Sequence, residues 1–155
     1  MPKGLLAELK QTKPFPSRGA EALVSILRTS AILEHQLGEA MRPFRITPTQ
    51  HNVLRILRGA GAAGLCGREV AERMVARVPD VPRLLERMEA QRLLSRERDA
   101  ADRRHVTARI TRKGLDLLER VDPVIAALES ARLGRLSERT LAGLIDGLAA
   151  VRDGT

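Results

Sequence analysis

The residues best suited to chemistry in this chain are arginines, and they gather in two neighbouring segments. Residues 81–91 have an amphipathic helical pattern that is dense in arginine. Residues 102–104 form a charged tip between two strand-like runs, 93–98 and 106–110. A helix followed by a basic β-ribbon can enter the major groove of DNA and contact the phosphates beside it. The pattern therefore indicates a binding module, not a catalytic site.

The charge and its distribution point to a polyanionic partner. The 155 residues include 27 Lys and Arg against 19 Asp and Glu, which gives a formal charge of +8. Residues 67–114 hold 13 of the basic and 8 of the acidic residues, so the excess is concentrated around the hairpin. An arginine-rich proteome would raise the count along the whole chain. The concentration therefore favours a nucleic-acid partner.

The composition predicts one mainly helical domain. Apolar residues make up 43% of the chain, but it has only 2 Phe and neither Trp nor Tyr. Leu, Val, Ala and Ile must therefore fill the core, which favours helices packed through aliphatic side chains over a β-sandwich.

Two helices are expected in the first part of the chain. Apolar residues recur at three- and four-residue steps over residues 18–41, which is typical of an amphipathic helix. A second helix should begin at Thr47, because Thr can cap, Pro48 suits the first helical position and Gln50 completes a capping box. Glycines at residues 59–61 should end it.

The next segments have the order of a winged helix-turn-helix. Residues 64–67 are interpreted as a linker into a short helix over residues 68–74. The arginine-rich helix should start at Pro79 or Asp80, because Pro82 is tolerated only within the first helical turn. The hairpin then follows as the wing.

The C-terminal region predicts further helices and a second chain. A long helical pattern after Thr111 should be bent or broken at Pro123, and Ser137 should cap a final helix. The terminal apolar stripes have too little partner surface within one small monomer. We therefore expect them to pack against a second copy in a two-fold dimer.

Several classes of protein are excluded by what the sequence lacks. The single cysteine, Cys66, rules out an intramolecular disulfide and suits a reducing cytoplasm. No apolar run or leader pattern suggests a membrane span or secretion, so we expect a cytoplasmic protein without a membrane partner. His35, His51 and His105 lack the spacing of a helical metal pair, and no phosphate-binding loop or nucleophile elbow occurs. We expect no metal, cofactor or enzymatic activity.

Three stretches together resemble the MarR family of bacterial transcription regulators. They are residues 46–57, residues 81–89, and Asp102–Arg103–Arg104 followed by Ile110 to Gly114. The resemblance extends from about residue 18 to residue 152. It implies a fold that is mainly α with a small β-hairpin wing, in which a winged helix-turn-helix is joined to N- and C-terminal dimerisation helices.

The resemblance also implies a domain organisation and a mode of action. Residues 1–155 would form a single MarR-type domain, with a DNA-binding lobe at 47–114 and dimerisation helices at 18–45 and 115–152. Members of the family usually repress a nearby gene or operon. Many release DNA when a small anion, often aromatic or phenolic, binds between the dimerisation helices and the lobe.

The resemblance assigns candidate DNA contacts by position. Arg83 and Arg87 face outward from the recognition helix, and the basic residues of the wing would lie over or in the minor groove. Asp102 is better suited to orienting a wing arginine than to touching DNA, since phosphates repel a carboxylate. The full set of candidates is Arg77, Asp80, Pro82, Arg83, Arg87, Arg98, Asp102, Arg103, Arg104 and His105.

Two residues depart from the family pattern. Pro82 stands where the family commonly has Thr or Ser, which removes a hydroxyl contact. Arg92 stands where Gly usually follows the recognition helix, and a left-handed backbone there would cost about 1 kcal/mol.

A weaker set of candidates concerns an effector. His35, Arg42, Arg45 and His51 fall on segments that border the effector cavity in relatives. Capping of helices or plain surface exposure explains these residues equally well. The lack of Trp and Tyr deprives an aromatic ligand of its usual stacking surfaces.

Two hypotheses of different class follow. The first is a sequence-specific, homodimeric repressor of double-stranded DNA that binds a pseudo-palindromic operator and responds to a small-molecule effector. The second is a small-molecule or redox receptor, with Cys66 as the sensor, whose winged helix coats DNA or contacts protein. A preferred DNA site would distinguish them.

Overall fold

The computed structural model describes residues 4–154, which divide into two units. The first unit, residues 4–39, contains the short helix α1 (Leu5–Glu8) and most of α2 (Arg18–Met41). The bounds of α2 confirm the helix expected over residues 18–41. Leu23 and Leu27 on α2 stay 59% and 61% exposed.

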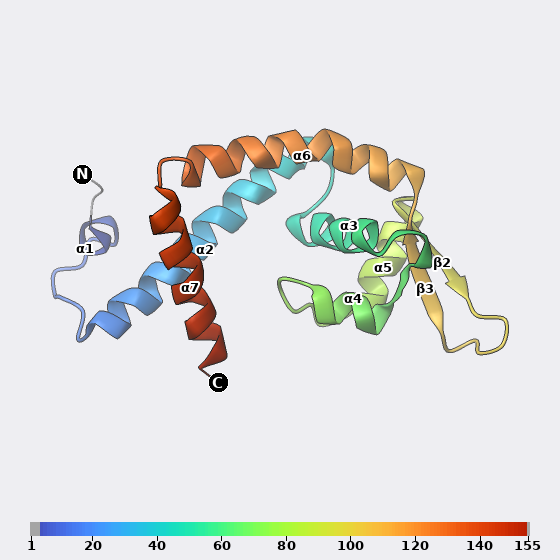
Figure 1. Cartoon of the computed structure of the whole chain (residues 1–155), viewed down its shortest axis with the longest axis horizontal. Helices are drawn as coiled ribbons and strands as arrows, with labels where there is room; N and C mark the ends of the chain where they lie inside the picture. The colour runs from blue at the N-terminus through green and yellow to red at the C-terminus, as the bar shows by residue number, and fades with distance from the viewer. Residues whose placement is uncertain (1–3, 155) are drawn as a thin grey trace. The chain divides into compact units, whose positions relative to one another are not determined.

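The second unit, residues 40–154, contains a helix-turn-helix, a small sheet and two C-terminal helices (Figure 1). After the short 3-10 helix η1 (Arg42–Phe44), α3 runs over Pro48–Ala60 and ends in a second one, η2 (Gly61–Ala63). Then come β1 (Leu65–Cys66), α4 (Gly67–Arg73) and α5 (Val81–Ala90). The chain continues through β2 (Leu94–Arg98), β3 (Val106–Ile110), α6 (Arg112–Leu133) and α7 (Glu138–Asp153).

The start of α3 confirms the capping box. The Gln50 N–H donates to Thr47 Oγ1 at 3.2 Å, and the Thr47 N–H donates to Gln50 Oε1 at 3.1 Å. Pro48 occupies the first turn, where its missing N–H costs nothing. Three of the four donors that a helix leaves free at its start are thereby satisfied or absent, so the helix starts at a defined residue.

The sheet has three antiparallel strands in the order β1–β3–β2. The segment interpreted as a linker, residues 64–67, contains β1, whose Leu65 pairs with Ala108 and Cys66 with Thr107. The interpretation as a linker was wrong because two residues are too few for a period-2 pattern to be visible. Gly64 has φ +67°, and a Cβ there would lie 2.5 Å from the Ala108 carbonyl oxygen. Glycine therefore permits this close approach of the two strands.

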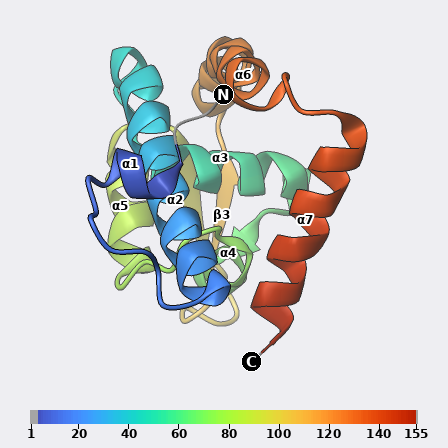
Figure 2. The ribbon, with the colours of Figure 1, turned by 90° about the vertical axis from the view of Figure 1, so that its left-hand side faces the viewer.

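The core of the second unit lies where α3, α5 and α6 meet the sheet. α3 contacts both β3 and α6, and α5 contacts α4 and β2 (Figure 2). The Arg58 Nη1 of α3 lies 2.6 Å from the Asp122 Oδ2 of α6. The side chains that are almost completely buried are aliphatic: Val53, Leu54, Leu57, Val70, Met88, Leu94, Leu118 and Val121.

α6 and α7 differ in how much of their surface is covered. α6 continues through Pro123, so the break that the sequence allowed there does not occur. Its buried residues, such as Leu118 and Val121, precede the proline and anchor the helix on α3. α7 starts at the predicted cap Ser137, but none of its residues is buried. Among residues 4–154, no helix combines the length and hydropathy needed to cross a membrane.

The fold class is confirmed: the chain is mainly helical with a small antiparallel wing and additional helices at both ends. The two ends of the expected single domain, residues 1–3 and 155, lie outside the described residues.

Candidate nucleic-acid interface

α5 buries one face and exposes a charged one. Asp80 caps its start by accepting the Arg83 N–H at 3.0 Å, and Pro82 follows at the second helical position. This agrees with a helix start marked by Asp80. Val81, Leu85 and Met88 are buried against the rest of the unit. The exposed positions between them are Pro82, Arg83, Glu86 and Arg87.

The end of α5 is fixed by a Schellman motif. Arg92 takes the left-handed conformation with φ +60°, although it stands where the family usually has glycine. Its N–H donates to the Glu89 carbonyl at 2.8 Å, and the Leu93 N–H donates to the Met88 carbonyl at 3.0 Å. This pair of bonds defines the motif. The Arg92 carbonyl accepts from Thr111 Oγ1 at 2.6 Å, which ties the end of α5 to the start of α6.

The turn between α4 and α5 is tied to α3. The Val75 N–H donates to Asn52 Oδ1 at 2.9 Å, while the Val75 side chain is 91% exposed. Arg77 lies in this turn and is exposed. The candidates Arg77 and Asp80 therefore lie on the approach to α5, next to its exposed face.

The tip of the wing is organised by two aspartates. The Asp99 N–H donates to the His105 carbonyl and the His105 N–H to the Asp102 carbonyl, each at 2.9 Å. The Asp102 carboxylate accepts the Arg104 N–H at 3.0 Å. Asp102 therefore shapes the turn through its side chain and its backbone. Arg103 and Arg104 remain exposed at the tip.

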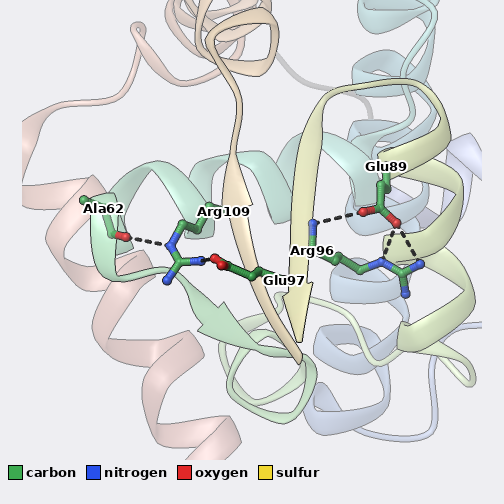
Figure 3. Close-up of polar contacts among 5 residues, drawn as sticks. All are labelled: Ala62, Glu89, Arg96, Glu97 and Arg109. Atoms are coloured by element: carbon green, nitrogen blue, oxygen red, sulfur yellow. Dashed lines mark hydrogen bonds and ion pairs between the residues drawn. The ribbon is translucent and has the colours of Figure 1, made fainter. Parts of the chain in front are cut away.

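One group of arginines is engaged in ion pairs that hold the wing (Figure 3). Arg96 of β2 lies 2.8 Å from Glu89 of α5, and its backbone N–H donates to the same carboxylate at 3.0 Å. Arg109 of β3 pairs with Glu97 of β2 at 2.9 Å and donates to the Ala62 carbonyl at 2.8 Å. These contacts join β2 to the recognition helix and β3 to the segment after α3.

A second group of arginines makes no ion pair or hydrogen bond through its side chain with any residue between 4 and 154. Two carboxylates of the same elements, Glu89 of α5 and Glu97 of β2, are occupied by Arg96 and Arg109. All members are exposed, so their charge faces solvent. They are Arg77, Arg83, Arg87, Arg98, Arg103 and Arg104.

The arginines that fix the wing were missed by the sequence analysis. In the sequence, Arg96 and Arg109 cannot be distinguished from the unpaired arginines, because all of them are arginines in the same basic segment. One signal was present, since Arg96 lies two residues after the buried Leu94 and therefore shares its face of the strand. The partner of Arg109 follows from the register of β2 on β3, and that of Arg96 from the packing of α5 on β2.

The four residues considered as contacts for an effector lie in different surroundings. His35 is exposed on α2 in the first unit, whereas Arg42, Arg45 and His51 belong to the second unit. His51 is 7% exposed, and its Nε2 has no partner among the described residues. Burial lowers the pKa of His51 below its ordinary value of 6.5, and the Arg55 guanidinium lowers it further. His51 is therefore held in the neutral form.

Cys66 lies in β1, immediately before α4. Its backbone N–H donates to Glu69 Oε2 at 2.9 Å. The Cys66 side chain accepts from the Glu69 backbone N–H, so the two residues form a capping box at the start of α4. This gives Cys66 a structural role, and the sequence contains no second cysteine that could resolve an oxidised thiol.

Comparisons with known proteins agree with this geometry. Residues 46–105 match the model of the MarR family. No curated protein sequence matches the chain.

Solved structures with this fold include regulators crystallised with DNA. A MarR transcription factor from Planctomyces limnophilus is 28% identical, with a TM-score of 0.69 over 88% of this chain and 99% of that one. The S. aureus MepR–DNA complex is 23% identical, with a TM-score of 0.78 over 85% and 96%. Sco3205 from Streptomyces coelicolor, a MarR family regulator in complex with DNA, is 22% identical, with a TM-score of 0.79 over 93% and 92%.

Proposed function

We propose that the chain is a MarR-type, DNA-binding winged helix-turn-helix regulator, and that it acts as a homodimeric repressor of a pseudo-palindromic operator. The match of residues 46–105 to the MarR family model and the fold shared with regulators crystallised with DNA support this proposal. The observation that carries the proposal is the set of exposed arginines on α5 and the wing that lack a partner among residues 4–154. An arginine without a carboxylate partner keeps all its donors for phosphates and base edges.

In this proposal, residues 47–114 form the DNA-binding lobe. α5 enters the major groove, where Arg83 and Arg87 contact guanine or phosphate. The wing lies along the adjacent minor groove with Arg103 and Arg104. Asp102 acts by shaping the turn that presents them, which is the function its hydrogen bond to the Arg104 N–H supports.

The dimer is proposed from apolar surface left exposed at both ends of the chain. α2 exposes Leu23 and Leu27, and α7 exposes Leu144, Ile145 and Val151. Large exposed aliphatic side chains on helices are the usual surface of association. Residues 18–45 and 115–152 would therefore pair with a second copy. Two-fold symmetry then places the half-sites about one helical turn, roughly 10 base pairs, apart.

We further propose that a small-molecule effector releases this protein from DNA. Its support within the chain is the buried His51, whose Nε2 lacks a partner among the described residues. The alternative proposal, a receptor that uses Cys66 and coats DNA without preference, has less support because Cys66 and Glu69 form the capping box of α4, which gives the cysteine a structural role.

The proposal is tested with the full chain in two steps. Selection from random duplexes at about physiological salt should enrich a palindromic motif, and a pool without a motif would favour non-specific coating. The affinity for the enriched duplex should then fall steeply with salt, since on the order of 6–10 phosphate contacts release counterions. Transcription from a promoter that carries the motif should fall when the protein is added, whereas an increase would contradict repression.

A variant pair tests the assignment of α5. Arg83→Ala should weaken binding to the enriched duplex by about 1–3 kcal/mol if Arg83 reads a base. Lys13→Ala removes one positive charge from an exposed position outside both the lobe and the proposed dimerisation helices and serves as the control. Equal affinity of wild type and Arg83→Ala would mean that the wrong face of α5 has been assigned to DNA.

A further inference from the structure

We infer that α5 hydrogen-bonds only G·C base pairs, with Asp80 and Glu86 accepting from cytosine while Arg83 and Arg87 donate to guanine. This inference rests on the proposed function, because it assigns bases to the surface proposed to enter the major groove. It concerns the operator half-site that α5 faces, not the contacts of the wing.

The first support is the position of Asp80. Its Oδ1 accepts the Arg83 N–H at 3.0 Å, and its other carboxylate oxygen accepts no hydrogen bond from residues 4–154. Asp80 is exposed at the N-terminal end of α5, and residues at this end of a recognition helix contact base edges. A carboxylate can only accept, and the cytosine N4 amino group is the matching donor in the major groove.

The second support is Glu86, which has no structural task. It lies three residues after Arg83 and next to Arg87, yet it makes no ion pair with either of them or with any other residue in the described range. Glu89, in contrast, is bound by Arg96. A carboxylate near phosphates is repelled, so an acid on this face is a cost unless it makes a specific contact. Acceptance from cytosine supplies that contact.

The third support is the absence of residues that read adenine. Adenine is recognised through its N6 and N7 by the amide of Asn or Gln. Residues 79–90 contain neither. Gln91 follows the helix, but its Oε1, the atom that would accept from adenine N6, already accepts from Gln50 Nε2 at 3.0 Å. Pro82 offers only carbon atoms, which can touch a thymine methyl group but form no hydrogen bond.

The fourth support is that two arginines on this face supply the hydrogen-bond donors that guanine requires. Arg83 and Arg87 are one helical turn apart, exposed, and without a carboxylate partner among residues 4–154. Each can donate two hydrogen bonds to guanine O6 and N7. Donors for guanine therefore alternate with acceptors for cytosine along one exposed face.

The experiment repeats the duplex selection with wild type, Asp80→Asn and Glu86→Gln, all as full chains. Both substitutions replace a carboxylate by an amide of the same shape, and Asn caps a helix as well as Asp does. Wild type should enrich G and C at the half-site positions that face α5. Each variant should change one symmetric position from C towards A, because an amide can pair with adenine. Its affinity for the wild-type motif should fall by about 5- to 150-fold.

Controls separate base reading from folding and charge. Glu8→Gln on α1 makes the same chemical change at an exposed position outside both the helix-turn-helix and the proposed dimerisation helices, and should leave the motif unchanged. The melting temperatures of the two α5 variants should match that of wild type. A structural effect would instead lower the affinity for all duplexes without changing the preferred base.

The outcomes are distinguishable. An enriched wild-type motif with A·T at the α5 positions overturns this inference and leaves the proposed function intact. Variants that retain C at every position also overturn it. A wild-type pool without any motif overturns the proposed function, and this inference with it.

Discussion

Replacing Arg92 by glycine should stabilise the protein, although Arg92 lies just after α5, the helix proposed to recognise DNA. Its φ of +60° places a side chain in the left-handed region, which costs an L-residue about 1–2 kcal/mol. Glycine avoids that cost but loses about 0.5–1 kcal/mol more backbone entropy on folding. The expected net gain in the free energy of unfolding is therefore about 0.5–1 kcal/mol.

The structure indicates that little else is lost in Arg92→Gly. The Arg92 side chain is exposed and makes no hydrogen bond or ion pair with the residues between 4 and 154. The bonds that matter use its backbone: its N–H donates to the Glu89 carbonyl, and its carbonyl accepts from Thr111. Glycine keeps both. For a protein of this size the gain corresponds to a rise in melting temperature of about 1–4 °C.

Thermal and urea unfolding should be measured at one fixed protomer concentration, since a dimer melts in a concentration-dependent way. Two controls isolate the backbone. Arg92→Ala removes the side chain but keeps the Cβ, so its stability should stay near that of wild type. Ala90→Gly puts glycine in the helix itself and should destabilise by about 1 kcal/mol. If Arg92→Gly is no more stable than Arg92→Ala, the left-handed backbone is not the source of strain.

Three further predictions concern the packing of the lobe. Gly114→Ala should destabilise by about 1–3 kcal/mol in thermal unfolding because its Cβ would clash with the Leu93 carbonyl oxygen, whereas Gly59→Ala, with open space around it, should gain up to about 1 kcal/mol. Arg96→Met should cost about 1–2 kcal/mol in urea unfolding, since Arg96 and its partner are only 26% and 37% exposed, and a buried charge would lose its partner. Because burial lowers the pKa of His51 in the folded state, the unfolded chain binds more protons as the pH falls below 6.5, and stability is lost there. The free energy of unfolding should fall less between pH 7.5 and pH 5.5 in His51→Met than in wild type. An equal fall in both proteins would exclude His51 as the cause.

The fold followed from the sequence wherever one segment decides its own conformation. Thr47, Pro48 and Gln50 provide a complete helix start within four residues, and the structure has that start. The apolar periods of α2 and α5 depend only on spacing along the chain. The sequence left the backbone at Arg92 open, because an arginine stands where the family usually has glycine, and the structure shows that it is left-handed. β1 was missed because two residues acquire strand geometry only by pairing with β3.

The candidate interface was predicted as a cluster of arginines, but the sequence could not divide them. Arg87, Arg96 and Arg103 are the same residue type in the same basic segment, so the sequence offers no basis for separating them. A salt bridge depends on which residues meet across space, and that is fixed by the register of β2 on β3 and by the packing of α5 on β2. Register and packing are properties of the whole fold, so the sequence alone determined the helices, the wing and the excess of basic charge. Only the tertiary structure assigned Arg96 and Arg109 to holding the wing and left the α5 and tip arginines without partners among the described residues.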